Sequence, residues 1–145
     1  MRIYLDNCCY GRTFDDQKQE RINLETRAVI EIQKLIIENK IELATSFILH
    51  YENGRKSDEE QMKIIDNFYR KYRKVYIGVE FADDLKMLVE KIIENGIKIK
   101  DAYHIASAIL AECDYFITVD KRLLKYTSEK IRLINPLEFL KILEE

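Results

Sequence analysis

Four acidic side chains are the residues of this sequence best suited to chemistry. Asp6 follows the apolar run "RIYL", and Asp120 follows the apolar run "YFITV". Glu52 comes shortly after the segment "IELATS", and Asp101 begins the helical segment "KDAYHIASAILAEC". Carboxylates ~5 Å apart repel each other by roughly 3 kcal/mol per pair at an effective dielectric constant near 20. If the four converge, a divalent cation is the physical explanation, and carboxylate oxygens favour Mg²⁺ or Mn²⁺.

Each of these acids also has an ordinary structural interpretation. Asp6 could close a turn, Glu52 could be solvated, and Asp101 and Asp120 could cap helices, which is the usual reason for Asp at a helix start. Capping does not exclude metal binding, because a carboxylate has more than one lone pair to offer. The residue types alone therefore leave both interpretations open.

The elements that must position the acids follow from hydrophobic periodicity. Ser57 and Glu60, for example, form the pattern of a helix-capping box. We predict strands at 2–5, 41–46, 74–78, 115–119 and 131–134, and helices at 24–39, 47–54, 57–72, 81–96, 100–113 and 136–145. Strands that alternate with helices favour right-handed crossovers and a mostly parallel sheet, so we expect an α/β protein with three α/β/α layers.

Sites in such sheets lie beyond the carboxyl ends of the strands. Asp6 and Asp120 follow strands directly, and Glu52 can reach the same edge from the helix after the second strand. Asp101 reaches it only if the loop before its helix also lies there, which periodicity does not determine.

Composition limits the class of protein. The chain has 145 residues, of which 47% are hydrophobic and 34% charged, and it is expected to form a single domain over 1–145. No apolar run is long enough for a membrane span, and the N-terminus turns polar before a signal peptide could form, so we expect a cytoplasmic protein. Three cysteines, two of them adjacent, argue against a disulfide framework. The net charge of −2 argues against a module that grips nucleic acid through a broad basic face.

Three segments resemble the signature regions of the PIN domain nucleases. They are "YLDNCCYGR", "ATSFILHYEN" and "IKDAYHIASAILAECDYFITVDKRLLK", and together they extend over nearly the whole chain. The resemblance implies a sheet in the order 3-2-1-4-5 and an acidic pocket formed by Asp6, Glu52, Asp101 and Asp120. In this sequence the stretch after Asp6, "NCCYGRTFDDQ", is read as a loop, where many relatives begin an apolar helix.

The resemblance also implies metal-dependent endonucleolytic cleavage of RNA that leaves a 5′-phosphate. Many family members, including the VapC-like ribonucleases, are toxins of bacterial or archaeal toxin–antitoxin pairs, and relatives often dimerise through the region of 81–96. An antitoxin partner and a homodimer are therefore expectations for this chain. The sequence does not separate a toxin from a stand-alone processing nuclease.

Other polar residues close to the acids are candidates for supporting roles. Asn7, Ser46 and Thr118 could donate hydrogen bonds that orient the carboxylates, although turn and strand-end hydrogen bonding is the ordinary interpretation of Asn7 and Thr118. Lys121 and Arg122 follow Asp120 directly and could meet a phosphate.

Two histidines and a basic segment have both a functional and an ordinary interpretation. His104 lies three residues after Asp101 and could assist proton transfer, but a packed, hydrogen-bonded histidine is the simpler interpretation. His50 is expected to point away from Glu52. The run "YRKYRK" at 69–74 could contact RNA backbone or be a solvated helix end.

Two other functions compete with a nuclease. A non-catalytic RNA-binding module on the same fold is the main alternative, and an incomplete set of acids would favour it. A phosphoacceptor or hydrolase of the receiver or dehalogenase type also ends its first strand in Asp, but it needs a lysine at a later strand end. Lys121 directly follows Asp120, so that order fits poorly.

Overall fold

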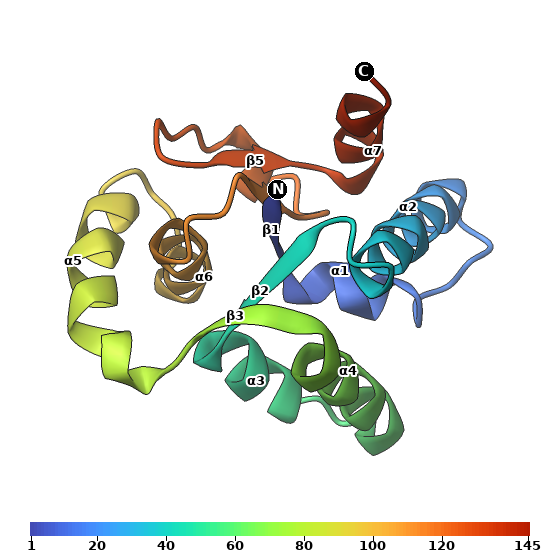
Figure 1. Ribbon diagram of the computed structural model, residues 1–145, viewed down its shortest axis with the longest axis horizontal. Coiled ribbons are helices and arrows are strands. Elements are labelled where there is room, and N and C mark those ends of the chain that lie inside the picture. The colour runs from blue at the N-terminus through green and yellow to red at the C-terminus, as the bar shows by residue number, and fades with distance from the viewer.

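A computed structural model describes residues 1–145 and contains a parallel sheet of five strands between helices (Figure 1). The strands are β1 (Arg2–Leu5), β2 (Glu42–Ser46), β3 (Arg73–Ile77), β4 (Tyr115–Ile117) and β5 (Arg132–Ile134). Their order in the sheet is β3-β2-β1-β4-β5, and every pair is parallel. The predicted α/β/α class and the order 3-2-1-4-5 are thereby confirmed.

Helices cover both faces of the sheet. The α-helices are α1 (Asn7–Arg12), α2 (Glu20–Ile37), α3 (Phe47–Gly54), α4 (Glu59–Tyr72), α5 (Ala82–Ile93), α6 (Ile99–Leu110) and α7 (Pro136–Glu144), with 3₁₀ turns η1 (Val79–Phe81) and η2 (Leu123–Lys125). Figure 1 shows α5 and α6 on one side of the sheet and α1, α2 and α7 on the other. No helix has both the length and the apolar character that a bilayer span requires.

The central strand β1 determines where the site lies. Ile3, Tyr4 and Leu5 are completely buried, as expected for the middle strand of a sheet covered on both faces. Leu5 pairs with Ile117 of β4, so both strands end at the same level. The backbone N–H of Asp6 then donates to the carbonyl of Ile117 at 2.9 Å, which fixes the first residue beyond β1 at this edge.

Two local predictions are wrong, and in both cases an aspartate caps the helix that the structure shows. The stretch after Asp6 is not a loop at its start, since Asn7–Arg12 form α1 with Asp6 as the N-cap. Helix α4 begins at Glu59 rather than at Ser57, because the Asp58 carboxylate accepts from the Gln61 backbone N–H at 3.1 Å. Asp is as good a cap as Ser, so adjacent candidates are not separable by residue type.

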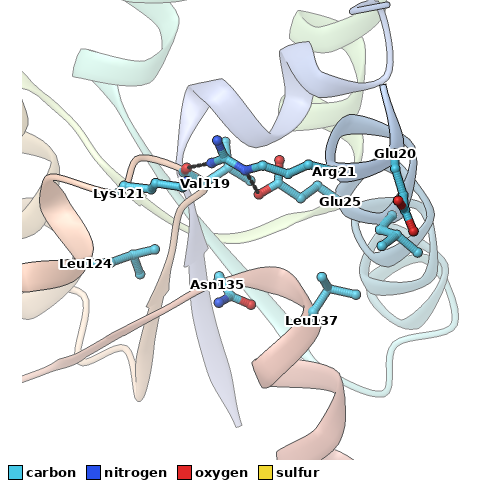
Figure 2. Close-up of a pocket in the computed structure, with 9 residues that line it drawn as sticks. Glu20, Arg21, Glu25, Val119, Lys121, Leu124, Asn135 and Leu137 are labelled. Atoms are coloured by element: carbon cyan, nitrogen blue, oxygen red, sulfur yellow. Dashed lines mark hydrogen bonds and ion pairs between the residues drawn. The ribbon is translucent and has the colours of Figure 1, made fainter. Parts of the chain in front are cut away.

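A buried ion network attaches α2 to the end of β4. The Glu25 carboxylate lies 3.1 Å from Arg12 Nε, at an angle that makes it an ion pair rather than a hydrogen bond, and accepts from Arg21 Nε at 3.3 Å. Arg21 Nη2 also donates to the carbonyl of Val119 at 3.0 Å. Figure 2 shows Arg21 reaching from α2 to both acceptors beside a cavity of about 390 Å³, which Lys121 also lines.

Candidate active site

Asp6 lies at the junction of β1 and α1, where its carboxylate accepts hydrogen bonds on both oxygens. The backbone N–H of Asn7 donates to Oδ1 at 2.8 Å, and the Thr118 hydroxyl donates to Oδ2 at 2.8 Å. The Cys8 thiol adds a weaker contact to Oδ2 at 3.4 Å. Asp6 is therefore both a helix cap and a buried carboxylate held rigidly at the carboxyl edge of the sheet.

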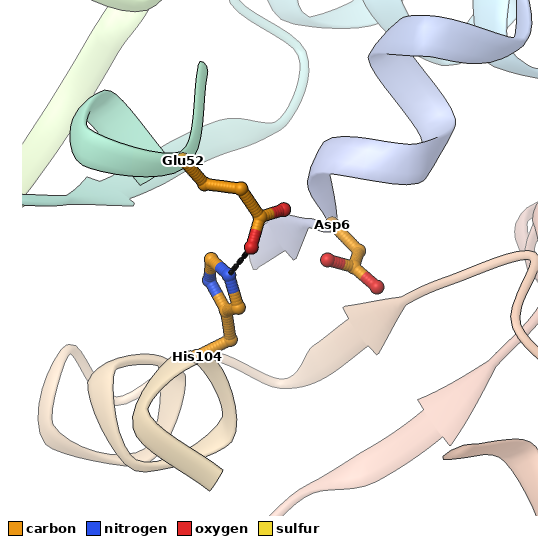
Figure 3. Close-up of side chains that lie close together, drawn as sticks. All are labelled: Asp6, Glu52 and His104. Atoms are coloured by element: carbon orange, nitrogen blue, oxygen red, sulfur yellow. Dashed lines mark hydrogen bonds and ion pairs between the residues drawn. The ribbon is translucent and has the colours of Figure 1, made fainter. Parts of the chain in front are cut away.

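Glu52 reaches the same place from α3. That helix starts directly after β2, and the Ser46 hydroxyl caps it by accepting from the Leu49 N–H at 3.3 Å. Carboxylate oxygens of Asp6 and Glu52 and a ring nitrogen of His104 all lie within 4.8 Å of one another. Figure 3 shows these three side chains converging from β1, α3 and α6.

Asp101 and Asp120 are not part of this group of three and line a neighbouring cavity. Asp101 is in the first turn of α6, and Asp120 follows β4 after a short extended stretch. Both line a cavity of about 340 Å³ together with Arg122 and Lys125. The backbone N–H of Asp120 donates to Thr118 Oγ1 at 3.1 Å, so one hydroxyl joins Asp6 to the Asp120 loop.

The carboxylates influence one another electrostatically. The pKa of Asp101 is raised above its ordinary value, first by burial and then by the negative charges of Asp6, Asp120 and Glu52, although His104 opposes the shift. Like charges this close disfavour ionisation of the acid with the fewest compensating donors. Asp101 accepts no hydrogen bond from the protein, so it is the acid on which the repulsion acts.

The pKa of Glu52 shifts in the opposite direction to that of Asp101. Burial raises its pKa, but hydrogen bonds from His104 and Asn7 and the charge of Lys100 outweigh burial and lower the pKa to about 2. His104 Nε2 lies 3.1 Å and Lys100 Nζ 3.3 Å from Glu52 Oε2. Glu52 is therefore ionised at every physiological pH.

The donor set fits a hard divalent cation. Asp6, Glu52, Asp101 and Asp120 offer carboxylate oxygens, which suit Mg²⁺ or Mn²⁺ better than softer metals. A cation between them would offset the repulsion that raises the pKa of Asp101.

The predicted supporting residues lie in different places. Thr118 donates to Asp6 through its hydroxyl, and Asn7 donates to Asp6 through its backbone N–H, while the Asn7 side chain lowers the pKa of Glu52. Ser46 contacts no acid, because its hydroxyl caps α3 and bonds to Tyr4. Arg122 borders the cavity of Asp101 and Asp120, and its backbone N–H donates to Asp120 Oδ1 at 2.8 Å. Lys121 instead lines the cavity beside α2 (Figure 2).

His50 and the basic run at 69–74 form a separate cluster between α3 and α4. His50 Nδ1 lies 2.9 Å from Asp66, which also accepts from Arg70 at 2.8 Å. Arg73 donates to His50 Nε2 at 3.0 Å and lies over the ring of Tyr76. His50 thus points away from Glu52, as predicted, and two of the arginines in the run are bound to neighbouring side chains.

Tyr4 and Cys8 contact the site and were not predicted to do so. The Tyr4 hydroxyl lies 2.7 Å from Ser46 Oγ and 2.8 Å from His104 Nδ1, entirely inside the protein. One signal in the sequence could have revealed Tyr4, which is a tyrosine in a strand predicted to be buried. A buried phenol needs a hydrogen-bond partner, so a polar side chain is expected beside it. Cys8 contacts Asp6 and Thr118, and its residue type gave no such signal.

Basic side chains surround the acids although the whole chain is weakly negative. A second cavity of about 410 Å³ adjoins Glu52 and is lined by Tyr51, Arg55, Lys56 and Lys100. The cavity of Asp101 and Asp120 carries three cations of its own, Lys98, Arg122 and Lys125. The negative centre therefore lies between two cation-rich cavities, an arrangement that net charge does not reveal.

Comparison with known proteins supports the fold. The crystal structure of FitAcB from Neisseria gonorrhoeae is similar to this structure with a TM-score of 0.57 and 16% sequence identity. The match covers 93% of this chain and 98% of that chain. No protein-family model matches the sequence, and no curated protein matches it. At this identity the likeness concerns the fold, which is PIN-like.

Proposed function

We propose that this chain is a metal-dependent endoribonuclease of the PIN type, which hydrolyses phosphodiester bonds of RNA. The observation that carries the proposal is the gathering of acids at the carboxyl edge of the sheet, where burial and then the negative charges of the other acids raise the pKa of Asp101. A structural role would not explain the arrangement, because the repulsion lowers the stability of the metal-free protein.

In this proposal Asp6, Glu52, Asp101 and Asp120 hold Mg²⁺ or Mn²⁺. When bound, such an ion acidifies a water for attack on phosphorus and neutralises charge on the phosphate oxygens. The chain itself keeps the ligands oriented: Thr118 and the Asn7 backbone hold Asp6.

RNA is the proposed substrate because the acids lie between two cation-rich cavities. Arg55, Lys56 and Lys100 would bind phosphates on the Glu52 side, and Arg122 and Lys125 would bind them on the Asp120 side. Cations on both sides of the centre suit a strand that continues past the cut in both directions, which is endonucleolytic cleavage. The resemblance in the signature segments favours a 5′-phosphate product.

The same resemblance extends the proposal to partners. A toxin of a toxin–antitoxin pair would bind a small antitoxin protein, and a homodimer would form through the region of 81–96. Both are tested by co-purification with the product of a neighbouring small gene and by the mass of the protein in solution.

The direct test is cleavage of labelled single-stranded and structured RNA by the purified protein in Mg²⁺, Mn²⁺ or EDTA. Asp6→Asn and Asp101→Asn should abolish cleavage. Asp84→Asn is the matched control, because Asp84, like Asp101, is an acid in the first turn of its helix but is exposed on α5. Cleavage that survives both site substitutions would contradict the proposed site. A protein that binds metal and RNA but cleaves neither kind of RNA would support the non-catalytic alternative.

A further inference from the structure

A chain of buried hydrogen bonds links α3 to the acid centre. The Leu49 N–H contacts Ser46 Oγ at 3.3 Å, Ser46 Oγ lies 2.7 Å from Tyr4 Oη, and Tyr4 Oη lies 2.8 Å from His104 Nδ1. The chain ends where His104 Nε2 meets Glu52 Oε2 at 3.1 Å. Ser46, Tyr4 and His104 are at most 1% exposed, so their hydrogen-bond partners must come from the protein.

The direction of the chain is fixed at its α3 end. A backbone N–H can only donate, so Ser46 Oγ accepts from Leu49. The Ser46 hydroxyl proton then has one remaining partner, Tyr4 Oη, and Tyr4 in turn donates its own proton to His104 Nδ1. Because Nδ1 accepts, the ring proton is on Nε2, and His104 presents an N–H to Glu52.

The opposite direction does not satisfy the same groups. If His104 Nδ1 donated to Tyr4, the Tyr4 hydroxyl would have to donate to Ser46 Oγ. The Ser46 proton would then have no acceptor, because its other neighbour is the Leu49 N–H. An unsatisfied hydroxyl on a fully buried side chain is strongly disfavoured.

We infer that His104 is a positioning residue that makes the centre an oxygen-only site and thereby selects Mg²⁺ or Mn²⁺ over Zn²⁺. Asp6, Glu52 and His104 are close enough to hold a metal together, and a mixed set of imidazole and carboxylate ligands would suit zinc. A ring nitrogen that carries a proton has no lone pair for a metal, so this nitrogen is unavailable. Its N–H instead holds the Oε2 oxygen of Glu52 at 3.1 Å.

The first test is the tautomer itself, measured by nitrogen-15 NMR on metal-free protein labelled at histidine. The protein has only two histidines, and His50 is an internal control with the opposite tautomer. Arg73 donates to His50 Nε2, so its proton is on Nδ1, facing Asp66. We expect one ring of each tautomer, with His104 assigned by its persistence in His50→Gln. A proton on Nδ1 of His104 would overturn the inference.

The second test is metal selectivity, measured as the ratio of Zn²⁺ to Mn²⁺ dissociation constants by calorimetry. Tyr4→Phe removes the only group that donates to Nδ1, so the protein no longer confines the ring proton of His104 to Nε2, and Nε2 can bind zinc. We expect the preference to move toward Zn²⁺ by at least about tenfold, the factor of a modest change in one ligand. Ser46→Thr keeps the hydroxyl and should behave as wild type. Zinc coordination by His104 in the wild type, visible in nitrogen-15 spectra of the same labelled protein recorded with Zn²⁺, would overturn the inference.

The metal-selective part of this inference depends on the proposed function, because it takes Glu52 to be a ligand. The two proposals fail differently. If no divalent ion binds at the acids, the proposed function fails and metal selection fails with it, whereas the metal-free spectrum still decides the tautomer. If ions bind but His104 carries its proton on Nδ1, only the positioning role fails.

Discussion

Asp101→Asn should stabilise the protein when no metal is present. The Asp101 side chain accepts no hydrogen bond, and its pKa is raised by burial and then by the charges of Asp6, Asp120 and Glu52. Removing its charge therefore relieves repulsion without breaking a contact. Most point substitutions destabilise a protein, so an increase in stability is a specific expectation.

The size of the effect follows from the spacing of the acids. Oxygens of Asp6 and Glu52 lie within 4.8 Å of each other, and charges at such a distance repel by about 3 kcal/mol at a dielectric constant near 20 and by about 1 kcal/mol in water. Asp101 lies outside that group and is half-buried, so its repulsion from each acid is weaker, and about 1–3 kcal/mol is expected for the sum over Asp6, Asp120 and Glu52. Loss of a carboxylate from the first turn of α6 offsets about 0.5 kcal/mol of this. A net gain of about 1–2 kcal/mol should raise Tm by about 3–6 °C.

The pH dependence has a defined sign. An acid whose pKa in the folded protein exceeds its ordinary value, here 3.8, destabilises the folded state when it is ionised. The penalty is absent below that ordinary pKa and reaches its full size only above the raised pKa. The stability difference between Asp101→Asn and wild type should therefore vanish in acid and grow toward neutral pH.

The assay is thermal and urea denaturation in EDTA and in excess Mn²⁺, with Asp84→Asn as the control for loss of an acid from a first helical turn. In Mn²⁺ at a hundredfold excess over Kd, the free energy of unfolding of the wild type should rise by about 2.7 kcal/mol. Because Asp101→Asn binds the ion weakly, the wild type should then be the more stable of the two proteins. If Asp101→Asn loses as much stability in EDTA as Asp84→Asn and responds equally to Mn²⁺, the argument for a repulsive acid centre is refuted.

Two further substitutions test the supports of the site. Thr118→Val removes the hydroxyl that donates to Asp6 at 2.8 Å, so the Kd for Mn²⁺, measured by calorimetry, should rise by about 10–100-fold; an unchanged Kd would show that Asp6 needs no such support. Arg12→Met leaves the buried Glu25 carboxylate with one partner, so urea denaturation should show a loss of about 3 kcal/mol. Arg21→Met should lose less, because that side chain is 49% exposed, and equal losses would contradict this account.

The sequence alone was sufficient to predict the strands and the edge of the sheet at which Asp6 and Asp120 lie. Apolar runs that end in a polar residue mark strand ends, and parallel strands end at a common edge. Asp101 could not be placed in this way, because its position depends on the loop between α5 and α6. The resemblance to PIN nucleases supplied that expectation, and the raised pKa of Asp101 now places its charge near Asp6. The roles of these acids in catalysis stay predictions.

Local periodicity could not supply the contacts made across the chain. Tyr4 and His104 are 100 residues apart, and nothing in either segment identifies the other as a partner. The orientation of Lys121 was equally inaccessible. β4 ends at Ile117, so the residues after it do not follow the alternation of a strand, and Lys121 lies beside α2 rather than toward the acids.

The acids of the centre differ in how far hydrogen bonds and neighbouring charges stabilise their ionised form. Asp6 accepts donors on both oxygens, and Glu52 is held ionised with a pKa of about 2 by His104, Asn7 and Lys100 against the effect of burial. Both carboxylates are held in place, and Glu52 is charged, before any cation arrives. Asp101 lacks such donors and has a raised pKa, so it is the acid whose charge adjusts to the charge beside it. Two fixed carboxylates with one adjustable neighbour limit repulsion in the metal-free protein and, in the proposed function, still provide full negative charge when a cation is present.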